Sequence, residues 1–160
     1  MKALGAVLIG LVIVAVSVFA DAAKGTATYK GKARAVTVTF KHAYLMKGPE
    51  AGSGKMIRRL VLSMTDVSDA LKSCQTMVCS DGGIGDGMTV DFDSGPRLNY
   101  WFVANDQLIQ YSGTVEPTAA RLTTDTPTHV AGTLTIDATG AGGPKVQVEF
   151  DASLVKELKN

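Results

Sequence analysis

The amino-acid sequence predicts an all-β protein: a single antiparallel β-sandwich, with a barrel as the alternative, of about eight or nine short strands. The first observation is that apolar and polar residues alternate with a period of two in many short segments, which is typical of strands with one buried face. The second is that Gly, Pro and Asn-Asp pairs separate these segments at short intervals, which leaves no room for long helices.

The first segment, residues 1–22, is predicted to be a signal peptide. Lys2 precedes an apolar run over residues 3–20 that contains no charge and only one polar residue, Ser17, and Ala20-Asp21-Ala22 has the small-x-small form of a cleavage site. An uncleaved membrane anchor is the alternative, because the run approaches the roughly 20 residues that span a bilayer. We expect cleavage after Ala22, and one β-sandwich domain over residues 23–160 that is periplasmic or secreted and free of the membrane.

The strands are predicted from the segments that alternate. The pattern is clearest at residues 36–41, 88–93 and 146–151, where Val, Met and Phe alternate with Thr, Lys, Asp, Gln or Glu. Each of these segments is expected to bury one face and expose the other. Further strands are predicted at residues 25–28, 56–64, 97–104, 107–115, 120–124 and 130–137.

One stretch breaks the strand pattern. Residues 68–73 open with a capping serine and continue with helix formers, which predicts a short helical connector. Cys74 and Cys79 follow, and they are the only cysteines in the chain. Two cysteines are too few for a structural zinc site and are spaced more widely than a C-x-x-C redox motif. In an exported protein they predict a disulfide loop; a redox-active pair and reduced thiols are the alternatives.

The charge of the chain argues against some partners. Its formal net charge is only +1, whereas nucleic acids and anionic membranes are bound through clustered positive charge. We therefore expect no nucleic-acid partner. No cofactor is expected either, because Gly52-Ser53-Gly54-Lys55 lacks the first glycine and the final Ser or Thr of a phosphate-binding loop.

Only two histidines, His42 and His129, could act as a general base, and no G-x-S-x-G or H-E-x-x-H motif accompanies them. Extending the alternation of strand 36–41 places His42 on the same apolar face as Val38 and Phe40. We expect no catalytic residues; a hydrolase that uses His42 or His129 is an alternative.

The glycine-rich segment 80–87 contains two candidate calcium ligands, Asp81 and Asp86. Their spacing matches no EF-hand loop, and a loop that leaves a disulfide needs glycines for its geometry alone. We expect no metal ion to be bound.

A hairpin over residues 97–115 is the predicted binding surface. A two-residue turn at Asn105-Asp106 would place Trp101 opposite Gln110 and on the same face as Asn99, with Arg97 nearby. The opposite face would carry only apolar and aromatic side chains. Trp101 is the only tryptophan, and a flat aromatic among hydrogen-bonding groups suits a sugar ring or a protein partner. Burial of Trp101 under a loop or a second sheet is the alternative.

Four strings, KHAY (41–44), KGPE (47–50), IRRLV (57–61) and GPRLNYW (95–101), resemble a group of small exported β-rich proteins of Gram-negative bacteria without assigned activity. The resemblance implies export and a β fold, and carries over no functional residue. We therefore expect an exported, non-catalytic binding or accessory protein of the bacterial envelope that recognises a protein or a glycan. A structural or envelope-stress protein without a small-molecule ligand is the alternative, and the oligomeric state stays open.

Overall fold

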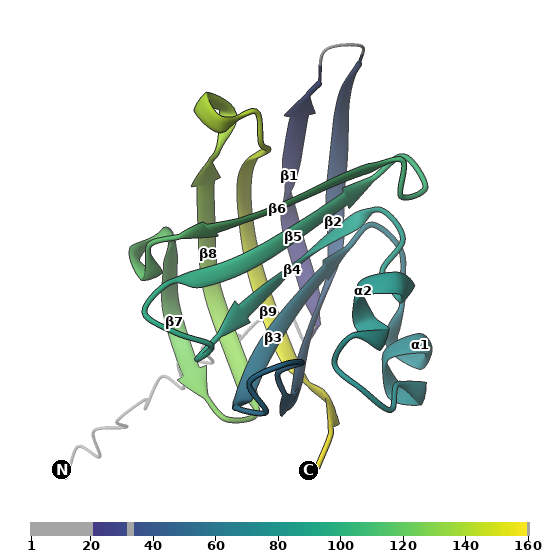
Figure 1. Cartoon of the computed structure of the whole chain (residues 1–160), viewed down its shortest axis with the longest axis vertical. Helices are drawn as coiled ribbons and strands as arrows, with labels where there is room; N and C mark the ends of the chain where they lie inside the picture. The colour runs from purple at the N-terminus through teal and green to yellow at the C-terminus, as the bar shows by residue number, and fades with distance from the viewer. Residues whose placement is uncertain (1–20, 32–33, 160) are drawn as a thin grey trace, which may run out of the picture.

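The structure, a computed structural model, describes residues 21–31 and 34–159 (Figure 1). It confirms the all-β class, with nine strands and two short helices. Most of the predicted signal peptide, residues 1–20, lies outside the described residues, but Ala22 begins the first strand. The elements are β1 (Ala22–Lys30), β2 (Ala35–Pro49), β3 (Met56–Ser63), α1 (Ser68–Ser73), α2 (Cys79–Gly83), β4 (Gly87–Phe92), β5 (Leu98–Ala104), β6 (Ile109–Val115), β7 (Ala120–Thr126), β8 (His129–Asp137) and β9 (Lys145–Glu157), with 3-10 turns at Pro117–Ala119 and Thr139–Ala141.

The strands form one sheet in the order β6-β5-β4-β3-β2-β1-β9-β8-β7. The sheet curls, so that β3 to β6 cross in front of β1, β9 and β8 in Figure 1. The arrangement is a half-barrel whose two halves face each other, rather than two separate sheets. Arg58 on β3 joins these halves, since its guanidinium donates to Asp93 after β4 (Nε to Oδ2, 2.7 Å) and to Asp125 on β7 (Nη1 to Oδ1, 2.6 Å).

Strand β1 is shorter than the two strands that flank it. It pairs with β2 on one side and β9 on the other, both antiparallel, and its first paired residue is Ala22. Beyond that point β2 and β9 meet each other directly in a parallel ladder, from Leu45 opposite Leu154 to Lys47 opposite Glu157. The start of β1 therefore lies in a fork between β2 and β9.

The main core fills the concave side of the sheet. The alternation of apolar and polar residues along each strand produces this core, because every second residue of a strand points inward. Phe40, Leu62, Val90, Phe102 and Phe150 are five of its buried members, contributed by five different strands.

A second apolar cluster covers part of the convex side. It includes Tyr44, Val61, Leu71, Met77 and Ile84, so helices α1 and α2 and their loops pack over β2 and β3. This cover explains why β3 is buried on both faces. Among the described residues, no helix is long and apolar enough to cross a membrane.

The inward and outward faces of β2 switch partway along the strand. Phe40 and Ala43 belong to the inner core, whereas Tyr44 belongs to the outer cluster. Ala22 pairs with His42 and Gly25 with Phe40, so the register shifts at this point. The expectation that His42 shares a face with Phe40 through simple alternation is therefore wrong, because an irregular pairing lies between them.

The predicted disulfide is confirmed. Cys74 and Cys79 are bonded, with Cα atoms 5.5 Å apart. The bond ties the end of α1 to the start of α2, and the predicted helical connector at residues 68–73 is α1 itself.

Candidate functional site

The hairpin of β5 and β6 places Asn99 and Trp101 on the convex side. Their neighbours Tyr100 and Phe102 belong to the inner core, as the alternation predicts. Trp101 is half-buried and packs against the outer cluster. Its side chain therefore has one covered part and one part open to solvent.

The predicted pairing within this hairpin is wrong by two residues. Ala104 pairs with Ile109, so Trp101 lies opposite Ser112, and Gln110 lies opposite Val103. The predicted two-residue turn is replaced by a four-residue loop, which moves the pairing but keeps each side chain on its predicted face.

Three successive loop residues explain this difference. Asn105, Asp106 and Gln107 have φ angles of 56°, 51° and 68°, a left-handed conformation that is uncommon outside glycine. Contacts hold the loop: the Asp106 N–H donates to Asp86 Oδ1 (3.1 Å), and Gln107 Nε2 donates to the Gly82 carbonyl (3.2 Å). The loop is therefore fastened to the segment that follows the disulfide.

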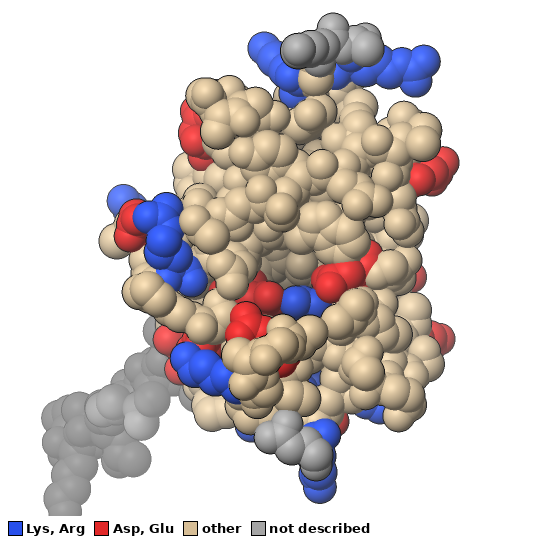
Figure 2. Space-filling view, viewed as in Figure 1, with Lys and Arg blue, Asp and Glu red and all other residues tan. Residues whose placement is uncertain are grey.

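Asn99 and Trp101 line a hollow of about 150 Å³ on the outer face. Figure 2 shows that acidic side chains surround a basic one in a hollowed part of this view. The hollow lies over β3, β4 and β5, beside α2. Its other lining residues are Arg59, Asp81, Thr89, Asp91 and Tyr100.

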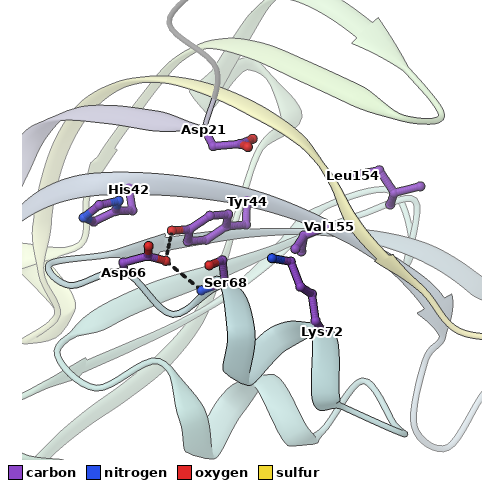
Figure 3. A pocket seen from close by; sticks show the side chains of 8 residues that line it. All are labelled: Asp21, His42, Tyr44, Asp66, Ser68, Lys72, Leu154 and Val155. Atoms are coloured by element: carbon purple, nitrogen blue, oxygen red, sulfur yellow. Dashed lines mark hydrogen bonds between the residues drawn. The ribbon is translucent and has the colours of Figure 1, made fainter.

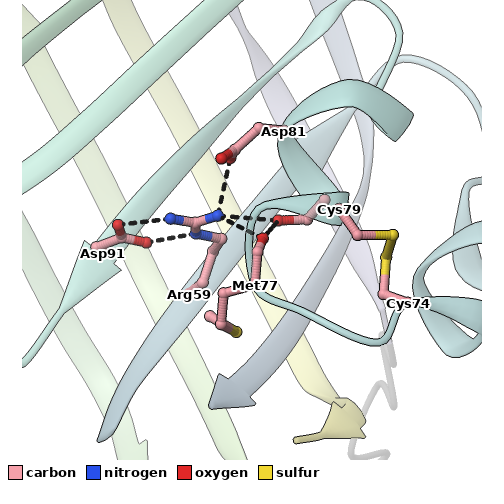
Figure 4. A network of polar contacts seen from close by, with 7 residues as sticks. Arg59, Cys74, Met77, Cys79, Asp81 and Asp91 are labelled. Atoms are coloured by element: carbon pink, nitrogen blue, oxygen red, sulfur yellow. Dashed lines mark hydrogen bonds and ion pairs between the residues drawn. A yellow bond between two sulfur atoms is a disulfide. The ribbon is translucent and has the colours of Figure 1, made fainter. Parts of the chain in front are cut away.

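Arg59 is the centre of this hollow. It binds Asp91 through two parallel hydrogen bonds, Nε to Oδ1 at 2.5 Å and Nη2 to Oδ2 at 2.8 Å (Figure 4). Its Nη1 donates to Asp81 Oδ1 (2.8 Å), to the Met77 carbonyl (2.9 Å) and to Ser80 Oγ (3.0 Å). Such a bidentate, multiply bonded guanidinium is held in one orientation.

The charges of the hollow perturb one another. Burial opposes the charged form of Arg59, but the hydrogen bond to Asp91 and the charges of Asp91 and Asp81 outweigh it and raise the pKa of Arg59. Burial, together with the charge of Asp91, raises the pKa of Asp81, and Arg59 only partly offsets this. One cation and two carboxylates leave the hollow net negative when all three groups are ionised.

The structure separates the four predicted binding residues into two groups. Asn99 and Trp101 line the hollow, and Asn99 Nδ2 donates to Ser94 Oγ at 3.0 Å. Arg97 instead pairs with Glu116, and the exposed Gln110 donates to the Gln107 carbonyl (3.2 Å). Arg97 and Gln110 do not line the hollow.

Sequence reasoning missed Arg59 and Asp91, which hold the hollow together. A signal existed: Arg58 and Arg59 interrupt the apolar run of residues 56–62, and a basic residue in a largely apolar strand needs a partner when it is buried. The partner could not be named from the sequence, because Asp91 is 32 residues away.

The two calcium candidates bind protein groups. Asp81 accepts from Arg59, and Asp86 accepts from the Asp106 N–H. Over residues 21–31 and 34–159, no group of three or more His, Cys, Asp or Glu side chains could hold a metal ion.

A second, larger hollow of about 500 Å³ lies between the fork at β1 and helix α1. Figure 3 shows Tyr44 Oη donating to Asp66 Oδ1 (2.6 Å), which also accepts from the Ser68 N–H (2.9 Å). The hydrogen bond from Tyr44, with help from Ser68, lowers the pKa of Asp66 to about 2. Burial and the same hydrogen bond raise the pKa of Tyr44 well above its usual value. His42, Asp21 and Lys72 also line this hollow.

The two histidines have different surroundings. The ring of His42 stacks beside Tyr44, with centroids 6.2 Å apart, and no side-chain hydrogen bond joins His42 to another described residue. His129 pairs with Asp151 (Nε2 to Oδ1, 2.7 Å) on the partly exposed faces of β8 and β9. No hydrogen bond joins either ring to a Ser or Cys side chain among the described residues, although His129 lies opposite Ser153 on β9. Such a hydrogen bond is what a nucleophile and its general base require.

Searches of protein-family models, of curated proteins and of solved structures found no match to this chain. The function is therefore argued from the residues of the site, because a fold class alone does not imply an activity.

Proposed function

We propose that this chain is an exported, non-catalytic binding protein of the bacterial envelope, and that it recognises a sugar ring of a glycan in the hollow around Arg59. One observation carries the proposal. The half-exposed ring of Trp101 lies in the same hollow as the amide of Asn99 and the fixed Arg59–Asp91 pair.

The chemistry of the hollow suits a saccharide. An aromatic ring offers a flat apolar face for the C–H groups of a sugar, while Asp81, Thr89 and Asn99 offer acceptors and donors for its hydroxyl groups. Arg59 already donates to protein groups through all three of its nitrogens. It therefore fixes the two carboxylates without having to change its own orientation when a ligand binds. The net negative charge favours a neutral or amino sugar over an acidic one.

The dimensions favour a sugar over a protein partner. The hollow of about 150 Å³ is smaller than the roughly 300 Å³ at which drug-sized pockets begin, and it fits one small ring. Protein interfaces of standard size bury about 800 Å² per partner around an apolar centre. The exposed large hydrophobic residues in the described part of the chain are Met64, Val78 and Leu108, and none of them lines the hollow.

A fluorescence titration tests the proposal directly. Trp101 is the only tryptophan, so the intrinsic emission of the protein reports on this site alone. An array of bacterial surface glycans identifies ligands, and neutral chito-oligosaccharides are then compared with acidic oligogalacturonides of equal length. We expect saturable changes in emission with the neutral series and weaker changes with the acidic one.

Two amides give a matched pair of variants. Asn99→Ala should weaken binding by about tenfold or more, because a hydrogen-bonding group of the site is lost. Gln110→Ala removes an amide from the same side of the hairpin but outside the hollow, and should leave the affinity unchanged. If no glycan alters the emission of Trp101, the proposal fails and the structural or envelope-stress role gains support. Binding of an envelope protein that both variants leave intact would place recognition elsewhere.

A further inference from the structure

We propose that signal peptidase cuts this chain after Ala20, two residues before the site that the Ala20-Asp21-Ala22 pattern indicates, so that the exported protein begins at Asp21. The inference rests on the export part of the proposed function and is independent of the glycan. The evidence for this cleavage site comes from Asp21 and Ala22, because both residues make contacts within the folded domain.

Asp21 fastens both branches of the fork at the start of β1. Its carboxylate Oδ1 accepts a hydrogen bond from the backbone N–H of Ser153 on β9, at 2.8 Å. Its backbone carbonyl accepts from the N–H of Ala43 on β2, at 3.4 Å. These contacts join residues that are far apart in the sequence, and a chain that began at Ala23 would lack both.

Ala22 extends the ladders on both sides of β1. It pairs with His42 on β2 and with Asp151 on β9. Removing it would shorten β1 where β2 and β9 begin to diverge around it. Each backbone group of a sheet that loses its partner costs stability of the order of one hydrogen bond. A cut after Ala22 would therefore remove contacts that stabilise the fold.

A new amino terminus at Asp21 also fits its surroundings. Asp21 lines the larger hollow together with Asp66, and the hydrogen bond from Tyr44 lowers the pKa of Asp66 to about 2. An α-amino group has an ordinary pKa of about 7.7–8.0 and is largely charged at neutral pH. Cleavage after Ala20 therefore places a positive charge at the edge of a hollow that is lined by the carboxylate of Asp66 and by one lysine, Lys72.

The sequence permits this cut. Val18-Phe19-Ala20 ends on a small residue and has a short side chain two positions earlier, which is compatible with the small-x-small requirement. The step is an ordinary hydrolysis: water adds across the Ala20–Asp21 peptide bond, the C–N bond breaks, Ala20 leaves with a new carboxylate and Asp21 gains an ammonium group.

Intact-mass measurement and N-terminal sequencing of the exported protein, produced from the full chain in a Gram-negative host, test the inference. We expect a product that begins at Asp21. A product that begins at Ala23 overturns the inference and leaves the export proposal standing. A membrane-bound product that keeps the apolar run overturns both.

Substitution of Asp21 in the full chain gives a second, independent test, since changing a residue that is removed cannot alter the mature protein. We expect Asp21→Ala to change the mass of the exported product accordingly and to lower its melting temperature by about 3–5 °C, because the bond to Ser153 is lost. Asp69→Ala, which removes a carboxylate whose side chain is 97% exposed, is the matched control and should not change the melting temperature. A product of Asp21→Ala with the mass and stability of the wild type would refute the inference.

Discussion

Arg59 and Asp91 show how strongly one buried pair can constrain a surface site. Their side chains are only 10% and 12% exposed, so each has lost most of its hydration and depends on the other for compensation. Breaking such a pair from one side leaves an uncompensated charge, which costs far more than the pair contributes as a whole.

We therefore expect Asp91→Ala to destabilise the protein by about 3–5 kcal/mol. Urea unfolding followed by circular dichroism measures this loss as a lower midpoint with an unchanged slope. Asp69→Ala serves again as the control, because exposed ion pairs contribute about 0–1 kcal/mol. A loss below about 1 kcal/mol in Asp91→Ala would show that Arg59 finds water or another partner.

The lowered pKa of Asp66 predicts that the stability of the fold depends on pH in the acidic range. Its pKa is lowered from 3.8 to about 2 in the folded protein, first by the hydrogen bond from Tyr44. A lowered pKa means that the folded state holds fewer protons than the unfolded state, so the contribution to stability is present above pH 3.8 and is lost as the pH falls through 2. We expect the difference in melting temperature between wild type and Asp66→Asn to shrink from pH 5 to pH 2. A constant difference over this range would contradict the assignment.

At the scale of elements, the disulfide and the two helices act on the site through one loop. Met77 lies inside the Cys74–Cys79 loop, and its carbonyl accepts from Arg59. Ser80 and Asp81 follow the second cysteine directly and bind the same guanidinium. The covalent loop thus positions three of the groups that orient Arg59.

We expect the double variant Cys74→Ser/Cys79→Ser to lose about 2 kcal/mol of stability and to shift the emission of Trp101 to longer wavelength. A reductant should produce the same shift in the wild type and none in the variant. The affinity of the double variant for the glycan should also be lower than that of the wild type, because Asp81 is no longer held beside Arg59. Identical emission spectra for wild type and variant would show that the loop keeps its shape without the bond.

Local signals predicted the elements well. Alternation and turn residues identified all nine strands, because half-buried strands require both signals. The β5–β6 hairpin was predicted, but its register was wrong by two residues. The reason is that the left-handed loop built from Asn105, Asp106 and Gln107 contains no glycine to indicate its conformation. The face switch between Phe40 and Ala43 was missed as well, because it depends on the pairing with β1.

The candidate site was only half predictable. Asn99 and Trp101 follow from alternation along one strand, which is a local property. Arg59 and Asp91 meet because β3 and β4 are neighbours with a particular register, and Asp81 joins them through the disulfide loop. Such contacts depend on the tertiary fold, and the local patterns of a single sequence do not predict them.

At the scale of the whole molecule, the curl of the sheet brings its two halves together around the main core. The sequence patterns of the individual strands do not predict this closure, since each pattern indicates only which face of its strand is buried. Arg58 marks the closure, because it connects β3 with the edge strand β7.

The parallel ladder between β2 and β9 constrains the order in which the sheet can form during synthesis. Lys47 and Glu157, 110 residues apart, form an ion pair across it, and β1 stays without its second neighbour until β9 arrives. Contacts between such distant segments form slowly, since a long loop must close first. The sheet can therefore be completed only after β9 has been synthesised. If the chain is exported as proposed, this late completion leaves β1 and β2 without a neighbour that the finished sheet requires while the chain is still being delivered.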